Sequence, residues 1–201
     1  MDSKLSRRRL LAAASAGLAL TGLPRAALAL NVNEARTLVD RVVADVNSVI
    51  NSGKSESQML PAFEKIFARY ADVTYIAQSA LGPAGRGASR AEMTAYVRAF
   101  QSYIARKYGR RFREFIGGRI EVTGARPLKS FFEVVSVAHL RGQAPFDLRW
   151  HVFDKSGKDL FFNLIIEGVN MLAAERTEIG AMLDKRKGSI SALTADLQRL
   201  G

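Results

Sequence analysis

The spacing of apolar side chains changes twice along this chain, and these changes limit the folds that it can adopt. From residue 31 to about residue 115 the apolar residues recur at the three- and four-residue intervals of amphipathic helices. From Arg119 to Val169 they alternate or run continuously, as in β-strands, and the helical interval returns from Met171. The sequence therefore predicts an α+β domain with N-terminal helices, a four-stranded antiparallel sheet and C-terminal helices.

The helices before the predicted sheet differ in how clearly their ends are marked. The first should cover residues 31–50, with Asn33 as its cap, and the second should contain residues 60–70, with Pro61 in its first turn. We expect these two to pack as an antiparallel pair. A short third helix should cover residues 72–81, and the glycine-rich segment 82–87 after it should form a flexible loop.

The next helix has the strongest start signal in the chain. Ser89 and Glu92 form the capping-box pattern, in which each side chain accepts a hydrogen bond from a free amide of the first turn. The helix should run to about Tyr108, and it either ends at Gly109 or continues to Phe115.

The predicted strands are of two kinds. In the segments 119–123 and 147–152 apolar and polar residues alternate, whereas 131–140 and 160–169 are apolar on both faces. The latter two should be central strands that are covered on both sides. After Gly168 we expect helices over residues 171–186 and 189–200.

Residues 1–29 have the layout of a cleavable export signal. A basic start precedes an apolar stretch of Leu10–Leu23, and Ala27-Leu28-Ala29 forms a small-x-small cleavage pattern. The stretch is shorter than the about 20 residues that a membrane-spanning helix needs. Ser6–Leu11 resembles the twin-arginine signal, and an ordinary secretion signal is the alternative. Residues 30–201 should then form a single, soluble, periplasmic domain.

Composition narrows the chemistry of the predicted mature chain. The formal net charge of +11 falls to +7 without residues 1–29, because five basic residues and one acidic residue lie there. Export makes nucleic acid an improbable partner, and anionic membrane surfaces or acidic proteins fit this moderate charge better. The chain has no cysteine, which excludes disulfides, thiolate metal sites and thiol nucleophiles.

No motif in the sequence indicates catalysis. The two histidines, His139 and His151, lie in predicted strands without a neighbour at metal-ligand spacing, so we expect no metal site. A serine elbow and a phosphate-binding loop are both missing. We therefore expect no catalytic residues, no cofactor and no enzymatic activity.

Several short segments together resemble the MlaC family, also called the toluene-tolerance family. The resemblance covers nearly all of the chain after the leader, and it is clearest in the C-terminal half. The matching segments are Glu167–Met171, Glu175-Arg176, Met182-Leu183, Gly188–Leu193, Ala80–Gly82, Ala99–Ile104 and Lys107–Gly109.

The resemblance implies a non-catalytic periplasmic lipid carrier. Members of the family hold phospholipid tails in an apolar cavity between sheet and helices. They shuttle lipid between an outer-membrane lipoprotein-porin complex and an inner-membrane MlaD-type ring with its ABC transporter. We expect a monomer whose bound phospholipid is its ligand. Maintenance of outer-membrane lipid asymmetry is the process that this resemblance implies.

Bulky apolar residues on both predicted layers are the candidates for the cavity wall, although the same residues could fill a close-packed core. The predicted lipid-binding residues are Phe67, Tyr70, Ile76, Tyr96, Phe100, Tyr103, Val122, Leu148, Trp150, Val152, Leu164 and Ile166.

The chain departs from the family pattern at three places. Pro83–Gly87 replaces an aromatic pair, Asn163 replaces an acidic residue and Phe162 replaces a tyrosine. A carrier of a sterol-like hopanoid or another apolar molecule is therefore an alternative. An enzyme or an interaction module on a similar scaffold is a further one.

Overall fold

The helices and the sheet follow one another in the order that the sequence predicts. The computed structural model describes residues 30–200, so the predicted leader lies outside the described residues. The elements are α1 (Val32–Ile50), α2 (Glu56–Tyr70), α3 (Val73–Leu81), η1 (Gly82–Gly87), α4 (Arg90–Gly109), η2 (Arg110–Phe115), β1 (Arg119–Leu128), β2 (Phe131–His139), β3 (Phe146–Phe153), β4 (Leu160–Ile166), β5 (Val169–Asn170), α5 (Met171–Lys185) and α6 (Ile190–Leu200).

Side-chain caps fix where the first helices begin. Asn31, and not the predicted Asn33, caps α1: its Oδ1 accepts from the amides of Asn33 and Glu34, at 2.9 and 3.1 Å. Ser55 and a glutamine three residues later form a capping box that starts α2 at Glu56. Pro61 therefore lies beyond the first turn, where its ring removes a backbone donor from the helix. The Ser89–Glu92 capping box of α4 is confirmed.

Two connections differ from the expected loops. Residues 82–87 form the 3₁₀ helix η1, so the prediction of a flexible loop was wrong for this segment. Pro83 stands in its first turn, where the fixed φ of proline favours helical geometry. The α-helical part of this segment ends at Gly109, which was one of its two predicted ends. A second 3₁₀ helix, η2, then continues to Phe115, which was the other.

The sheet has five strands in the order β1-β2-β3-β4-β5, and all neighbours are antiparallel. The fifth strand is a two-residue addition to the four that the alternation predicts. β2 is central, as expected. β4 has only this short strand on its far side, and a bridge between Ala71 and Phe161 covers more of that edge. The amide of Asp72 also donates to the carbonyl of Phe161, at 2.8 Å.

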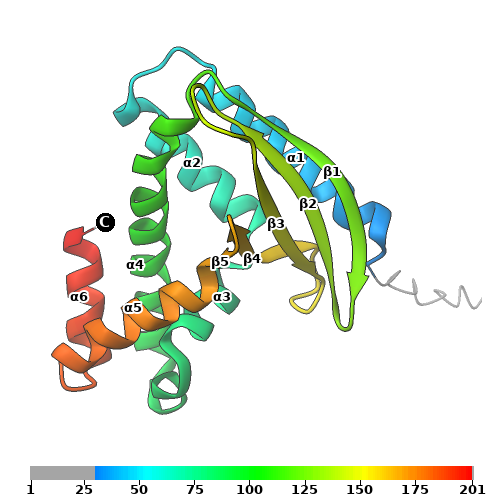
Figure 1. Ribbon diagram of the computed structural model, residues 1–201. Helices are drawn as coiled ribbons and strands as arrows, with labels where there is room; N and C mark the ends of the chain where they lie inside the picture. The colour runs from blue at the N-terminus through cyan, green and yellow to red at the C-terminus, as the bar shows by residue number, and fades with distance from the viewer. Residues whose placement is uncertain (1–29, 201) are drawn as a thin grey trace, which may run out of the picture.

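One face of the sheet, which we call the inner face, is directed toward the helices. Val134, Trp150 and Leu164 stand opposite one another on β2, β3 and β4, so their side chains share this face. Helix α1 packs against β1, β2 and β3, and its buried valines include Val39 and Val42. Figure 1 shows the curved sheet with α1 alongside it, while α4, α5 and α6 stand together on the other side of the molecule.

Candidate functional site: an apolar cavity between the sheet and the helices

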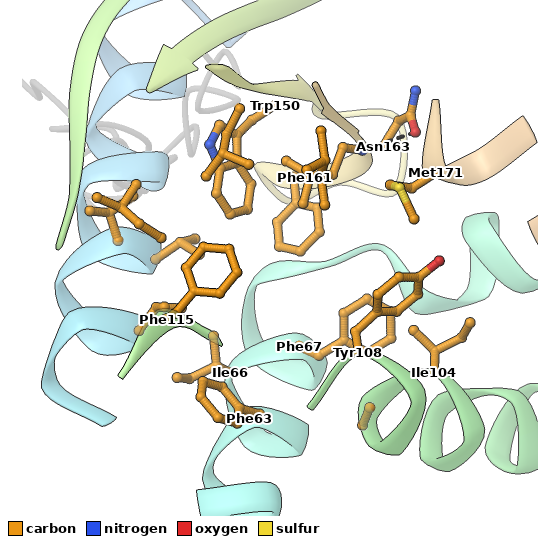
Figure 2. Close-up of a pocket in the computed structure, with 18 of the residues that line it drawn as sticks. Phe63, Ile66, Phe67, Ile104, Tyr108, Phe115, Trp150, Phe161, Asn163 and Met171 are labelled. Carbon is orange, nitrogen blue, oxygen red and sulfur yellow. Dashed lines mark hydrogen bonds between the residues drawn. The ribbon is translucent and has the colours of Figure 1, made fainter. Parts of the chain in front are cut away.

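A cavity of about 270 Å³ lies between the inner face of the sheet and the helices. This volume is slightly below the roughly 300–1,000 Å³ that is typical of small-molecule sites. Most of the lining side chains are apolar, and Figure 2 shows how they surround a common space. The lining residues are Val42, Val43, Val46, Phe63, Ile66, Phe67, Ile76, Ile104, Ala105, Tyr108, Glu114, Phe115, Ile120, Leu140, Gln143, Phe146, Leu148, Trp150, Phe161, Phe162, Asn163, Leu164, Ile166, Glu167, Met171, Leu172 and Glu175.

Three aromatic rings make one wall of the cavity. The rings of Trp150 and Phe161 meet edge to face, with their centroids 5.3 Å apart, and the ring centroid of Phe67 on α2 lies 6.3 Å from that of Phe161. The indole Nε1 of Trp150 donates to the hydroxyl of Ser136 on β2, at 2.9 Å. Because the polar atom of the indole has this partner within the sheet, the ring can lie against an apolar ligand without leaving a donor unsatisfied.

Exposed polar residues mark where the cavity opens. Glu114 of η2, Gln143 between β2 and β3, and Glu167 after β4 all belong to the lining and are all exposed to solvent. The mouth therefore combines polar residues from three connections, whereas the interior walls are formed by helices and strands.

Half of the residues predicted to bind lipid lie in the cavity wall. These are Phe67, Ile76, Leu148, Trp150, Leu164 and Ile166. Leu148 stands opposite Ile166, and Trp150 stands opposite Leu164, so β3 and β4 bring four of the six together. Whether they contact lipid stays a prediction.

The structure places the other predicted residues outside the wall. Tyr96 and Phe100 are fully buried on α4, where the hydroxyl of Tyr96 donates to the carbonyl of Ala77 at 3.1 Å. Tyr70 donates to Asp45 at 2.8 Å, and Tyr103 donates to Glu178. The remaining two are Val122 on β1 and Val152 on β3, both packed with the hydrophobic core.

A buried carboxylate interrupts the apolar wall at α5. Glu175 is 3% exposed, and its Oε1 accepts from Lys107 Nζ at 2.7 Å and from the hydroxyl of Tyr108. Lys107 also donates to Glu178, at 2.5 Å. Burial, together with the nearby charge of Glu175, raises the pKa of Tyr96. Glu175 thus places a carboxylate in a wall that is otherwise mostly apolar.

On the opposite, outer face of the sheet a row of polar side chains crosses four strands and ends at Asn163 of β4, which also lines the cavity. Arg126 donates to Glu133 at 2.6 Å, His151 Nε2 lies 3.6 Å from Glu133, and His151 Nδ1 lies 3.3 Å from the amide nitrogen of Asn163. Asn163 Oδ1 accepts from the amide of Leu172 at the start of α5, at 3.1 Å. This polar row therefore ties the sheet to α5, the helix that carries Glu175.

Neither histidine belongs to a metal-binding cluster within residues 30–200. His139 Nε2 lies 3.2 Å from Glu121, and His151 is held in the polar row. In this part of the chain no group of three or more histidine or acidic residues is arranged to hold a metal ion. No helix of the described residues is both long and apolar enough to cross a membrane.

Sequence reasoning missed lining residues on α1, α2, α4 and α5, whereas Ile76, the lining residue on α3, was predicted. Val42 and Val46 were visible as an apolar stripe on α1, and Ile66 belonged to the predicted apolar side of α2. Periodicity gave no signal for Glu175, since an acidic residue on a helix usually faces solvent, although Glu175-Arg176 is one of the segments that carry the family resemblance.

The fold and the cavity define a class of protein in which a curved antiparallel sheet and a set of helices enclose an apolar binding space. The sequence model of the family "MlaC protein" matches residues 37–199. The chain belongs to the MlaC family.

A solved structure has the same fold. It is the phospholipid-binding protein from Ralstonia solanacearum in complex with a phospholipid, and it superposes with a TM-score of 0.70 at 18% sequence identity. The match covers 83% of this chain and 96% of that one. The similarity confirms the mixed helix and antiparallel-sheet architecture.

Proposed function

We propose that this chain is a lipid carrier that holds the acyl chains of a phospholipid in the apolar cavity. The observation that carries the proposal is the nearly continuous apolar wall between the inner face of the sheet and the helices. Burial of one CH₂ group is worth about 0.8 kcal/mol, so an acyl chain of roughly 16 carbons gains on the order of 12 kcal/mol. Membership of the MlaC family and the phospholipid in the related Ralstonia structure support this function.

Binding rather than catalysis is the activity that the family supports. Among the described residues that line the cavity there is no serine, cysteine, histidine or lysine. Glu175 lies in the wall, but its Oε1 is already engaged by Lys107 and Tyr108. Beyond Glu114 and Glu167 at the exposed mouth, a substrate would therefore find one partly occupied carboxylate and no nucleophilic side chain with a base beside it.

The carrier would act in the periplasm after removal of residues 1–29. It would receive and deliver phospholipid at an outer-membrane lipoprotein-porin complex and at an inner-membrane MlaD-type ring with its ABC transporter. Polar residues at the mouth, such as Gln143, would leave the headgroup in contact with water during transit. Such a carrier needs no cofactor, and a monomer suffices.

Native mass spectrometry of protein isolated from the periplasm tests this function. We expect the mass of a chain that begins at Leu30, together with the additional mass of an intact phospholipid. Fragmentation of the released ligand distinguishes a phospholipid from a hopanoid, and an altered lipid would indicate an enzyme. Folded protein that carries no lipid would contradict the proposal.

A further inference from the structure

Glu175 has a carboxylate of which only one oxygen is used. Oε1 accepts from Lys107 and from Tyr108, whereas Oε2 is buried and has no hydrogen-bond partner among the residues that the structure describes. A buried acceptor without a partner is destabilising, and such groups are rare in folded proteins. The orphaned oxygen therefore needs a partner that this part of the chain does not supply.

The charges around this oxygen favour a donor, and most of all a cationic one. Lys107 is shared between the carboxylates of Glu175 and Glu178, which its Nζ contacts at 2.7 and 2.5 Å. The hydroxyl of Tyr103 donates to Glu178, so this tyrosine is a neutral donor in the same cluster. Oε2 belongs to a carboxylate, so a hydrogen-bond acceptor placed there would be repelled, and a cationic donor would form the strongest hydrogen bond.

Glu175 lies at one side of the cavity, away from its most apolar part. Its neighbours on α4 and α5 include Tyr108 and Met171, which Figure 2 shows across the cavity from Trp150 and Phe115. The opposite wall, where α1 meets the sheet, is lined by Val42, Val46 and other aliphatic residues. The cavity therefore has an aliphatic side and a side that contains one unsatisfied acceptor.

We infer that Glu175 Oε2 accepts a hydrogen bond from the bound lipid, so that the cavity selects lipids that carry a hydroxyl or primary ammonium donor. The acyl chains then lie toward α1 and the sheet, and the donor-bearing end lies toward α5. This selectivity rests on the proposed lipid-carrying function, to which it adds the class of lipid and the direction in which it lies.

A competition between three headgroups tests the selectivity. The protein as isolated from the periplasm is incubated with vesicles that contain equal amounts of phosphatidylethanolamine, phosphatidylglycerol and phosphatidylcholine with identical acyl chains. The protein is then separated from the vesicles, and its bound lipids are quantified by mass spectrometry. The ethanolamine lipid offers an ammonium donor, the glycerol lipid offers hydroxyl donors, and the choline lipid offers neither.

The wild-type chain should take up one or both donor lipids about tenfold in preference to phosphatidylcholine, the factor expected for a hydrogen bond to a charged group. Preference for the ethanolamine lipid alone would identify the ammonium as the donor, and preference for the glycerol lipid would identify the hydroxyl. Glu175→Leu should abolish the preference while total lipid uptake remains. If this variant does not fold, Glu175→Gln, which keeps the size of the side chain but removes its charge, should still reduce the preference several-fold.

Glu178→Gln is the matched control, because Glu178 shares Lys107 with Glu175 but is not part of the cavity wall. This variant should keep the wild-type preference. Uptake of the three lipids in equal proportions, or the same loss of preference in both the Glu178 and Glu175 variants, would overturn the inference and leave the carrier function standing. Absence of lipid uptake in the wild-type chain would overturn both.

Discussion

Phe67 and Phe100 are aromatic residues from predicted apolar helix faces that the structure places in different surroundings. Phe67 is half-buried and lines the cavity beside Phe161. Phe100 is fully buried on α4, with its ring 5.9 Å from that of Tyr96, and it has no part in the wall. The two residues therefore distinguish the cavity wall from the packed core.

Replacement of each phenylalanine by alanine should have opposite consequences for stability and for lipid binding. Phe100→Ala should lower the free energy of unfolding by about 3–5 kcal/mol, because it leaves a cavity in a packed core. Phe67→Ala should cost less stability but should reduce the bound lipid per folded molecule. Urea denaturation and mass spectrometry of bound lipid measure the two effects. Equal lipid loss in both variants would show that the wall extends to Phe100.

His151 gives stability a dependence on pH. Burial lowers its pKa below the ordinary value of 6.5, and the charge of Glu133 opposes this effect only in part. The unfolded chain therefore binds a proton at a higher pH than the folded chain does. Stability from this group is complete above about pH 6.5 and falls as the pH decreases toward the lower pKa of the folded state.

The free energy of unfolding should therefore decrease between pH 7 and pH 5, and His151→Gln should make this decrease smaller. Denaturation at a series of pH values measures both slopes. A variant with the same slope as the wild-type chain would show that His151 is not the group that titrates.

At the scale of elements, the sequence predicted most helices and strands because their signals are local. The alternation of Leu148, Trp150 and Val152 and the capping box of Ser89 depend on neighbouring residues alone. The start of α2 was placed too late because the Ser55 capping box lies five residues before the apolar run that begins at Leu60. The predicted strand 160–169 was too long, because a turn at Glu167 and Gly168 separates β4 from β5, and two residues are too few to show the alternation of a separate strand.

The cavity wall was harder to predict because it depends on how the elements pack together. Tyr96 and Trp150 both lie on apolar faces. The face of α4 that carries Tyr96 is buried against other helices, whereas Trp150 lines the cavity between the sheet and the helices. Helix or strand periodicity identifies the buried side of an element, and it cannot say whether a ligand or another side chain fills the space beside it.

The connection between η2 and β1 holds Phe115 in the cavity wall, and Gly118 is central to it. A Cβ atom at Gly118 would lie 2.7 Å from the carbonyl oxygen of His139 and 3.1 Å from that of Phe115. Since both are backbone atoms, the connection would have to move. A Cβ atom at Gly124, within β1, would meet nothing within 4 Å.

Gly118→Ala should therefore destabilise the fold by about 1–3 kcal/mol, the usual cost of forced overpacking. Because Phe115 would move with the connection, this variant should also retain less lipid. Gly124→Ala should change stability by no more than about 0.5 kcal/mol. Thermal or urea denaturation compares the two variants. Equal stabilities would show that the backbone near His139 can move without a loss of stability.

At the scale of the whole molecule, the N-terminal end of the described chain is joined to the turn between β3 and β4. The backbone nitrogen of Leu30 lies 3.2 Å from Asp154 Oδ2, and Leu30 is 7% exposed. Nearby, burial and the charges of Glu34 and Asp154 raise the pKa of Asp159. The surroundings of Leu30 are thus acidic, and Leu30 directly follows the predicted cleavage site.

Cleavage after Ala29 would turn this nitrogen into an α-ammonium, which is largely protonated below a pKa of about 7.7–8.0. An amide donates to asparagine as well as to aspartate, whereas an ammonium gains additionally from the negative charge. Asp154→Asn should therefore lower the stability of the mature chain by up to about 1 kcal/mol, as for an exposed ion pair. In a chain with a short glycine-serine extension before Leu30, the same substitution should have almost no effect. Urea denaturation of the four proteins at pH 7 measures the difference, and equal effects with and without the extension would show that the charge created by cleavage does not stabilise the fold.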